Sequence, residues 1–265
     1  MFFKTNDGVS LAYQDTGGTG TTLIFGAGFS GTQLEWQEQV EFFSQQGYRV
    51  VTMDWRSHGQ STRTSKNLRI SRLAADLEEL ITYLGLDQVV LIGHSMGASI
   101  IWAYLSLFGE TKVQAVVAVD ESPELLNTPD WPNGLFDISW ENLPLLGPTI
   151  MHHKMTALPV ATDLKKQLIE QKKLHPFNED LVYPLLVNHL CQDWRGTLYD
   201  VTLPQLFMVG GQSPLWPAGY QEAIKTLLNS DSAIVVVPTS GHLIHLECPA
   251  IFNEEVVKFL QLKKL

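Results

Sequence analysis

Six short apolar runs, rich in β-branched residues, recur along the chain, and each ends in glycine or polar residues. They are TTLIFGAG (21–28), YRVVTMD (48–54), QVVLIGHS (88–95), VQAVVAVD (113–120), PQLFMVGG (204–211) and SAIVVVP (232–238). Continuous apolar runs of this length are typical of strands buried on both faces of a sheet. Residues 2–14 instead alternate around the turn signal Asn6-Asp7-Gly8, which predicts an opening β-hairpin.

Between the apolar runs, the spacing of apolar residues changes to three and four, which predicts helices. The pattern covers residues 70–86, where Gly85 offers a stop, and recurs in residues 99–109 and 251–262. Strands that alternate with helices predict an α/β fold, here a mostly parallel, doubly wound sheet of about eight strands. Ligands of such sheets bind at the carboxyl ends of the strands.

The alternation is interrupted once, between about Ser122 and Val201, where no clear strand occurs but short helical patterns do. A structureless loop of this length is uncommon in a compact domain. We therefore expect a helical cap, residues 122–200, inserted into an α/β core formed by residues 1–121 and 201–265.

Composition and charge narrow the class of function. Of the 265 residues, 45% are hydrophobic and 17% are charged, as in compact globular proteins. The net charge of -10 and the lack of a Lys/Arg run argue against a nucleic-acid partner. The first ten residues lack the apolar core of a signal peptide, and no apolar stretch approaches the roughly 18–20 residues that span a bilayer. We expect a cytoplasmic protein without a membrane partner.

No cofactor or metal motif is visible. Cys191 and Cys248 are too few for a disulfide framework and lack the spacing of a metal site, so reduced thiols are expected. The pairing with carboxylates that helical zinc sites show is missing at His152, His153, His175 and His189. We expect a small-molecule substrate, no metal and no cofactor, and the oligomeric state is left open, a homodimer included.

The candidate chemistry centres on Ser95, in the motif Gly93-His94-Ser95-Met96-Gly97. Its position between a predicted strand and a predicted helix suits a nucleophile elbow, although a small serine in a tight turn is the alternative. His242 follows the last predicted strand, in a loop from which it can act as general base, or merely cap a helix.

Nearly the whole chain resembles the α/β-hydrolase-fold proteins, in the order and spacing of four motifs. They are GAGFSGTQLEW (26–36), DWRSHGQS (54–61), GHSMG (93–97) and GHLIHLECP (241–249). The resemblance implies that Ser95 is the nucleophile and His242 its base. It also implies that the backbone amides of Phe29 and Met96 form the oxyanion hole.

The chain departs from this family at two places. The histidine usual in the loop after the third strand is replaced by Ala27, which leaves the polar support of the oxyanion loop in question. The position of the usual acid is Ser213, and no Asp or Glu occurs between Leu203 and Ala218. A catalytic histidine needs an orienting carboxylate. We expect Asp120, at the end of the sixth strand, to be that acid, with Glu121 as the alternative.

These features predict a serine carboxylesterase that cleaves small to medium apolar or aromatic esters through an acyl-enzyme. Substrate-binding positions are expected at Trp55, Trp131, Phe136 and Trp140. Two alternatives remain. The first is a cofactor-free 3-hydroxy-4-oxoquinoline 2,4-dioxygenase, whose members the chain resembles in the WRSHG loop and in the acid after the sixth strand. There His242 and Asp120 would deprotonate the substrate. The second is a ligand receptor on a retained hydrolase scaffold.

Overall fold

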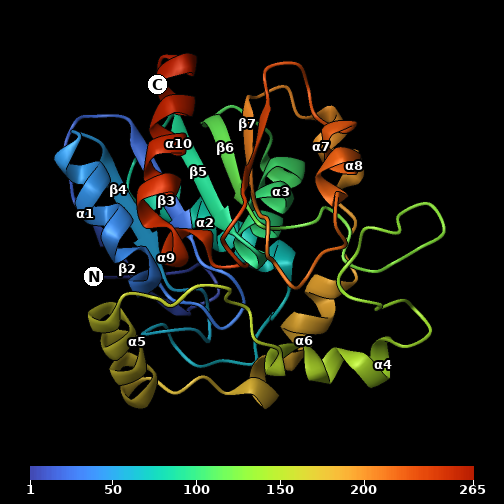
Figure 1. The fold of residues 1–265 in the computed structure, drawn as a ribbon. Helices are drawn as coiled ribbons and strands as arrows, with labels where there is room; N and C mark the ends of the chain where they lie inside the picture. Colours follow the sequence, from blue (N-terminus) through green and yellow to red (C-terminus); the bar gives the residue numbers. More distant parts are fainter.

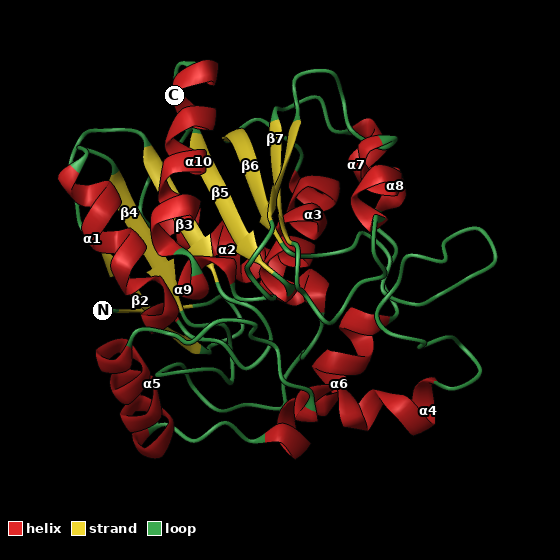
Figure 2. Cartoon of the chain, in the orientation of Figure 1, coloured by secondary structure: helices red, strands yellow, loops and turns green.

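The computed structural model describes residues 1–265 and contains one eight-stranded sheet with the order β1-β2-β4-β3-β5-β6-β7-β8. Its strands are β1 (Phe2–Lys4), β2 (Ser10–Asp15), β3 (Thr22–Gly26), β4 (Arg49–Met53), β5 (Val89–His94), β6 (Val113–Val119), β7 (Gln205–Gly210) and β8 (Ala233–Val237). The strand pairs β1–β2 and β2–β4 are antiparallel, and all others are parallel. The predicted hairpin and the mostly parallel sheet are confirmed (Figures 1 and 2).

Helices cover both faces of the sheet, as the alternation of side chains along each strand requires. On one face α1 (Gln37–Gln45) and α10 (Pro249–Lys263) pack on Leu23, Phe25 and Ile92. On the other face, α2 (Ile70–Tyr83) and α3 (Met96–Phe108) pack on Ile24 and Leu91. The short helix α8 (Tyr220–Lys225) lies on the α3 side, near β7. The predicted helices correspond to α2, α3 and α10.

Strand β8 differs from the sequence-based expectation. Its apolar run predicts a strand buried on both faces, but Val236 is 42% exposed and Ala233 is also exposed. The reason is its place at the edge of the sheet, where β7 is its only neighbour. A continuous apolar run does not by itself distinguish an edge strand from a central one.

Most of the segment between β6 and β7 lies beyond the carboxyl ends of the strands, whereas its last helix lies beside α8 (Figure 1). It contains α4 (Leu143–Leu146), the 3-10 helix η2 (Gly147–His152), α5 (Thr162–Leu174), α6 (Glu179–Leu190) and α7 (Arg195–Asp200). Leu185 of α6 packs in the cluster of α2, and Leu186 in the cluster of α3 and β7. The division of the chain into core and cap stays a prediction, because this segment shares its apolar clusters with the helices of the sheet.

Two short elements flank the loops that matter for the site. The 3-10 helix η1 (Gln33–Trp36) follows the loop after β3, and α9 (Ile244–Glu247) follows His242. Cys191 and Cys248 are free thiols. None of the helices is both long and apolar enough to cross a membrane.

Candidate active site

Ser95 lies in a sharp turn between the last residue of β5 and the first residue of α3. Its backbone has φ 51° and ψ -126°, a strained conformation for a residue with a side chain. The turn is held from both sides, since the Ser95 amide donates to Val119 O at 2.9 Å and Ser95 O accepts from the Ala98 amide at 2.7 Å. This is the geometry of a nucleophile elbow, which presents the hydroxyl at the end of the sheet.

The two glycines of the motif are required by close backbone contact. A Cβ atom on Gly97 would lie 2.4 Å from Gly26 O, and one on Gly93 would lie 2.4 Å from the Gly97 carbonyl carbon. The same crowding brings the loop after β3 to the nucleophile, because a Cβ on Gly28 would lie 3.0 Å from Ser95 Cβ. The sequence therefore folds the elbow and the neighbouring loop against each other.

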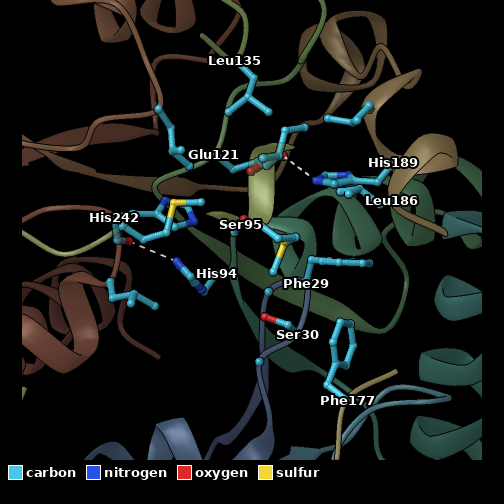
Figure 3. A pocket seen from close by; sticks show the side chains of 18 of the residues that line it. Phe29, Ser30, His94, Ser95, Glu121, Leu135, Phe177, Leu186, His189 and His242 are labelled. Atoms are coloured by element: carbon cyan, nitrogen blue, oxygen red, sulfur yellow. Dashed lines mark hydrogen bonds and ion pairs between the residues drawn. The ribbon is translucent and has the colours of Figure 1, made fainter. Parts of the chain in front are cut away.

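His242 and Asp120 meet at the same end of the sheet. His242 Nδ1 lies 2.7 Å from Asp120 Oδ2, and both side chains are buried. The His242 amide is fixed by a 2.9 Å hydrogen bond to Met155 O, so the segment between β6 and β7 helps to position the histidine. Ser95 and His242 line one cavity (Figure 3). The structure therefore brings together the three residues that the sequence suggests for a triad.

The Asp120 carboxylate is held by donors from β7 and the residues that follow it. They are Gly210 N (2.8 Å), Ser213 Oγ (2.7 Å), Trp216 Nε1 (3.2 Å) and Tyr220 Oη (3.4 Å). Ser213 stands where the resemblance places the usual acid, and its hydroxyl donates to the same oxygen that contacts His242. These donors fix the position of the carboxylate against His242.

The loop after β3 offers the predicted oxyanion donor. The Phe29 amide makes no hydrogen bond within the protein, and Met96 is the first residue of α3, where amides lack an intrahelical acceptor. The missing loop histidine is compensated in part by Trp55, whose Nε1 donates to Ala27 O at 2.8 Å. Trp55 thus supports the loop from beneath it.

A cavity of about 550 Å³ opens over Ser95. Much of its wall is apolar, formed by Phe29, Leu125, Leu135, Ile150, Met151, Met155, Phe177, Leu186, Leu190, Leu215 and Trp216. Polar and charged side chains also line it, among them Glu35, Lys172 and Glu179. Figure 3 shows Glu121 and His189 above Ser95 and His242 to its left. A chamber of this size and lining suits a small organic molecule.

The four substrate-binding positions expected from sequence do not line this cavity, and the expectation is corrected. Trp55 is buried beneath the oxyanion loop, next to Gly26. Trp131 is buried in an apolar cluster, with Nε1 donating to Glu124 O. Phe136 packs on the ring of His153, and Trp140 is 58% exposed.

Three cavity residues were missed or assigned other roles by sequence reasoning: Glu35, Glu121 and His189. Burial raises the pKa of Glu121 well above its ordinary value, and the negative charge of Asp120 adds to this. Burial lowers the pKa of His189 to about 3. Both shifts favour the neutral forms of the two groups, whose Glu121 Oε1 and His189 Nε2 atoms lie 3.5 Å apart. The available signal was the position of Glu121, directly after a buried strand.

One group of side chains has the composition of a metal site. It consists of Glu35, His94 and His245, which place one ligand atom each within 4.8 Å of one another. Its two histidines differ from the four that were considered for a metal site in the sequence. His94 Nε2 donates to His242 O at 3.0 Å, which leaves Nδ1 with a free lone pair. Burial raises the pKa of Glu35 to about 7. A tetrahedral zinc site needs donor atoms about 3.3 Å apart, so the group would have to contract to hold an ion.

Comparison with known proteins agrees with this architecture. The family model described as "alpha/beta hydrolase fold" matches residues 21–150. A non-heme haloperoxidase of Rhodococcus erythropolis is 33% identical over 135 residues, which cover 51% of this chain and 49% of that protein. The match thus spans about half the length of this curated relative. The sn-1-specific diacylglycerol lipase ABHD11 of Mus musculus is 28% identical over 94% of this chain and 85% of its own length.

Among solved structures, an esterase from Exiguobacterium antarcticum superposes with a TM-score of 0.86. The two chains are 21% identical, and the superposition covers 98% of each. At this identity the likeness shows the fold alone.

Proposed function

Because the chain belongs to the α/β-hydrolase fold superfamily, we propose that it is a serine hydrolase that cleaves carboxylic esters through an acyl-enzyme on Ser95. The proposal rests mainly on the 2.7 Å contact between His242 Nδ1 and Asp120. His242 lines the same cavity as Ser95, which has the strained backbone of a nucleophile elbow. A nucleophile, a base and an orienting carboxylate are the three parts that acyl transfer requires.

In the proposed reaction, His242 takes the proton of the Ser95 hydroxyl as Oγ forms a bond to the ester carbonyl carbon. Asp120 accepts the Nδ1 hydrogen bond, fixes the tautomer and stabilises the imidazolium. The oxyanion receives hydrogen bonds from the amides of Phe29 and Met96. The alcohol leaves with the proton from His242, and a water molecule activated by the same histidine then hydrolyses the acyl-enzyme.

The cavity supports small to medium apolar or aromatic esters as the substrate class. Its volume of about 550 Å³ and its leucine, methionine and phenylalanine lining favour burial of an apolar acyl or alcohol group. The rings of Phe29 and Phe177, whose centroids are 5.3 Å apart, pack edge to face in this wall and can contact an aromatic substrate group. These cavity residues take the place of the four aromatic residues expected from the sequence.

The test combines covalent labelling with an ester panel. A fluorophosphonate should modify Ser95, and peptide mass spectrometry should locate the adduct there and not in Ser95→Ala. The same protein should hydrolyse p-nitrophenyl esters of short and medium chains, with the Ser95→Ala variant inactive. Oxygen uptake with a hydroxyquinolone and no ester turnover would indicate the dioxygenase instead. Ligand binding that is unchanged in Ser95→Ala, without turnover, would indicate a receptor.

A further inference from the structure

A second polar centre lies in the cavity, beside the nucleophile but outside the proposed triad. Glu121 follows Asp120 at the end of β6 and is 1% exposed. Its Oε1 accepts from Ser99 Oγ at 3.1 Å and lies 3.5 Å from Nε2 of His189, on α6. The Ser95 hydroxyl lines the same cavity and interacts with this carboxyl group, which opposes the rise of the Glu121 pKa. In Figure 3, Glu121 lies between Ser95 and His189.

Burying Glu121 and His189 in the cavity wall costs free energy unless a ligand forms hydrogen bonds with them. Both side chains are buried and line the cavity together with Leu125, Leu186 and Leu190, and His189 Nδ1 has no hydrogen-bond partner. A buried polar atom without a partner costs about 1–3 kcal/mol relative to a satisfied one. The proposed acyl transfer assigns neither residue a role, and an apolar pair would pack against these leucines without that cost.

Burial favours the neutral forms of both groups, and the donors and acceptors of these forms, which face the cavity side by side, fit one class of ligand. A carboxylic acid and a neutral imidazole each present one donor and one acceptor. A substrate carboxylate would leave their acceptors facing its own negative charge, and Asp120 next to Glu121 adds to that repulsion. A substrate hydroxyl is complementary, because it donates one hydrogen bond and accepts another.

We propose that Glu121 and His189 form a polar subsite that binds a hydroxyl group of the substrate close to the scissile carbonyl. The subsite rests on the proposed function, because it selects among the esters that Ser95 would cleave. Since Glu121 reaches the Ser95 hydroxyl, and a hydrogen bond spans about 3 Å, the bound hydroxyl stands one or two carbons from the ester group. Both sides of the ester meet this condition, so the hydroxyl belongs to the acyl chain or to the alcohol.

The experiment compares ester pairs that differ by one hydroxyl group. Ethyl 3-hydroxybutyrate against ethyl butyrate tests the acyl side, and 2-hydroxyethyl butyrate against propyl butyrate tests the alcohol side. In the wild type, kcat/KM should favour the hydroxylated member of one pair by about tenfold or more, since a site built for a hydroxyl discriminates against its absence. The pair that shows the preference identifies the side on which the hydroxyl lies.

Variants connect that preference to the subsite. Glu121→Met removes the donor and the acceptor at similar volume and should reduce the ratio to about one to three, whereas Glu121→Gln keeps both functions and should retain most of it. Glu124→Gln is the matched control, since Glu124 is also buried but pairs with Arg195 away from the cavity. The fraction labelled by fluorophosphonate corrects each rate for misfolded protein.

The outcomes separate this proposal from the proposed function. A ratio near one for both pairs in the wild type, with the parent esters hydrolysed, overturns the subsite and leaves the serine hydrolase intact. A ratio unchanged in Glu121→Met, or lowered equally in Glu124→Gln, also overturns it. Absence of hydrolysis and of labelling at Ser95 overturns the proposed function itself.

Discussion

Asp120 Oδ2 lies 2.7 Å from His242 Nδ1, although the two residues are 122 positions apart in the chain. The contact links the end of β6 to the loop after β8, with β7 between them in the sheet. Asp120 spans that gap with a backbone φ of 49°, and its amide donates to Met208 O at 2.7 Å. The turn that directs this carboxylate toward the histidine is therefore anchored to β7.

This contact makes Asp120→Asn the direct test of the proposed acid. An asparagine can present an N–H group to Nδ1, which favours the wrong tautomer of His242 and removes the charge that stabilises the imidazolium. We expect kcat to fall by about two to four orders of magnitude, with KM little changed. Stopped-flow or steady-state hydrolysis of a p-nitrophenyl ester measures this. Near wild-type turnover in a folded Asp120→Asn would contradict the assignment.

The fold could be predicted from the sequence where an element has a clear hydrophobic pattern and also lies in the core. The central strands and α2 combine a strong period with a position in the core. In contrast, α1 contributes only Gln39, Val40 and Phe43 to the interior, so its pattern is too weak to predict a helix. Helix α8 has only six residues, which is too short for a periodic pattern that would predict a helix.

The site residues that could be predicted from the sequence lie in the turns and loops that follow strands, His242 after β8 among them. Ser95 directly follows β5, and Asp120 and Glu121 directly follow β6. Because these strands are parallel, the residues that follow them meet at one edge of the sheet. The residues of the cavity wall could not be predicted from the sequence. Which aromatic residues face the cavity depends on how the segment between β6 and β7 packs, and this packing leaves no local pattern. Trp131 turns into an apolar cluster and Trp140 into solvent, whereas Phe177 reaches the cavity.

Gly97→Ala should prevent the elbow from forming. The added methyl group would lie 2.4 Å from the Gly26 carbonyl oxygen. Both groups are attached directly to backbone, so no side-chain rotation can relieve the clash. We expect a loss of about 3 kcal/mol or more in the free energy of unfolding, measured by urea titration. Gly196→Ala on α7 is the control, because a methyl group there meets no atom within 4 Å. It should be neutral or stabilising by up to about 1 kcal/mol.

Acid should destabilise the protein through its buried neutral histidines. His58 is fully buried, and burial lowers its pKa from 6.5 to about 4. Because the folded value lies below the unfolded one, the unfolded chain binds the extra proton between about pH 6.5 and pH 4. Stability from this residue is therefore complete above that window and is lost as the pH falls through it, by up to about 1.4 kcal/mol per pH unit.

Urea unfolding at pH 7 and pH 5 measures that loss. In His58→Asn the decrease between the two pH values should be smaller by about 2 kcal/mol, because one titrating group is gone. His152→Asn, which removes an exposed imidazole, should retain the wild-type pH dependence. An equal pH dependence in His58→Asn and the wild type would show that His58 does not titrate differently in the two states.

The position of Ser213 predicts that the acid can be moved. Ser213 Oγ lies 2.7 Å from Asp120 Oδ2, the oxygen that contacts His242. An aspartate at position 213 is longer than serine by one C–O bond of about 1.2 Å, so its carboxylate oxygen covers about half of the distance to the place that Asp120 Oδ2 now occupies. The exchange of the two side chains, Asp120→Ser with Ser213→Asp, keeps the charge and the total volume at the site.

We expect Asp120→Ser alone to lose about two to four orders of magnitude in kcat and the double variant to recover about one to two of them. Recovery stays partial because Gly210 N and Tyr220 Oη are aimed at a carboxylate that starts from β6. Asp120→Ser with Ser213→Asn is the control, since it has the same shape without the charge and should recover nothing. A double variant no faster than Asp120→Ser would mean that the turn after β7 cannot direct a carboxylate at Nδ1, and that only the strained turn at Asp120 provides that angle.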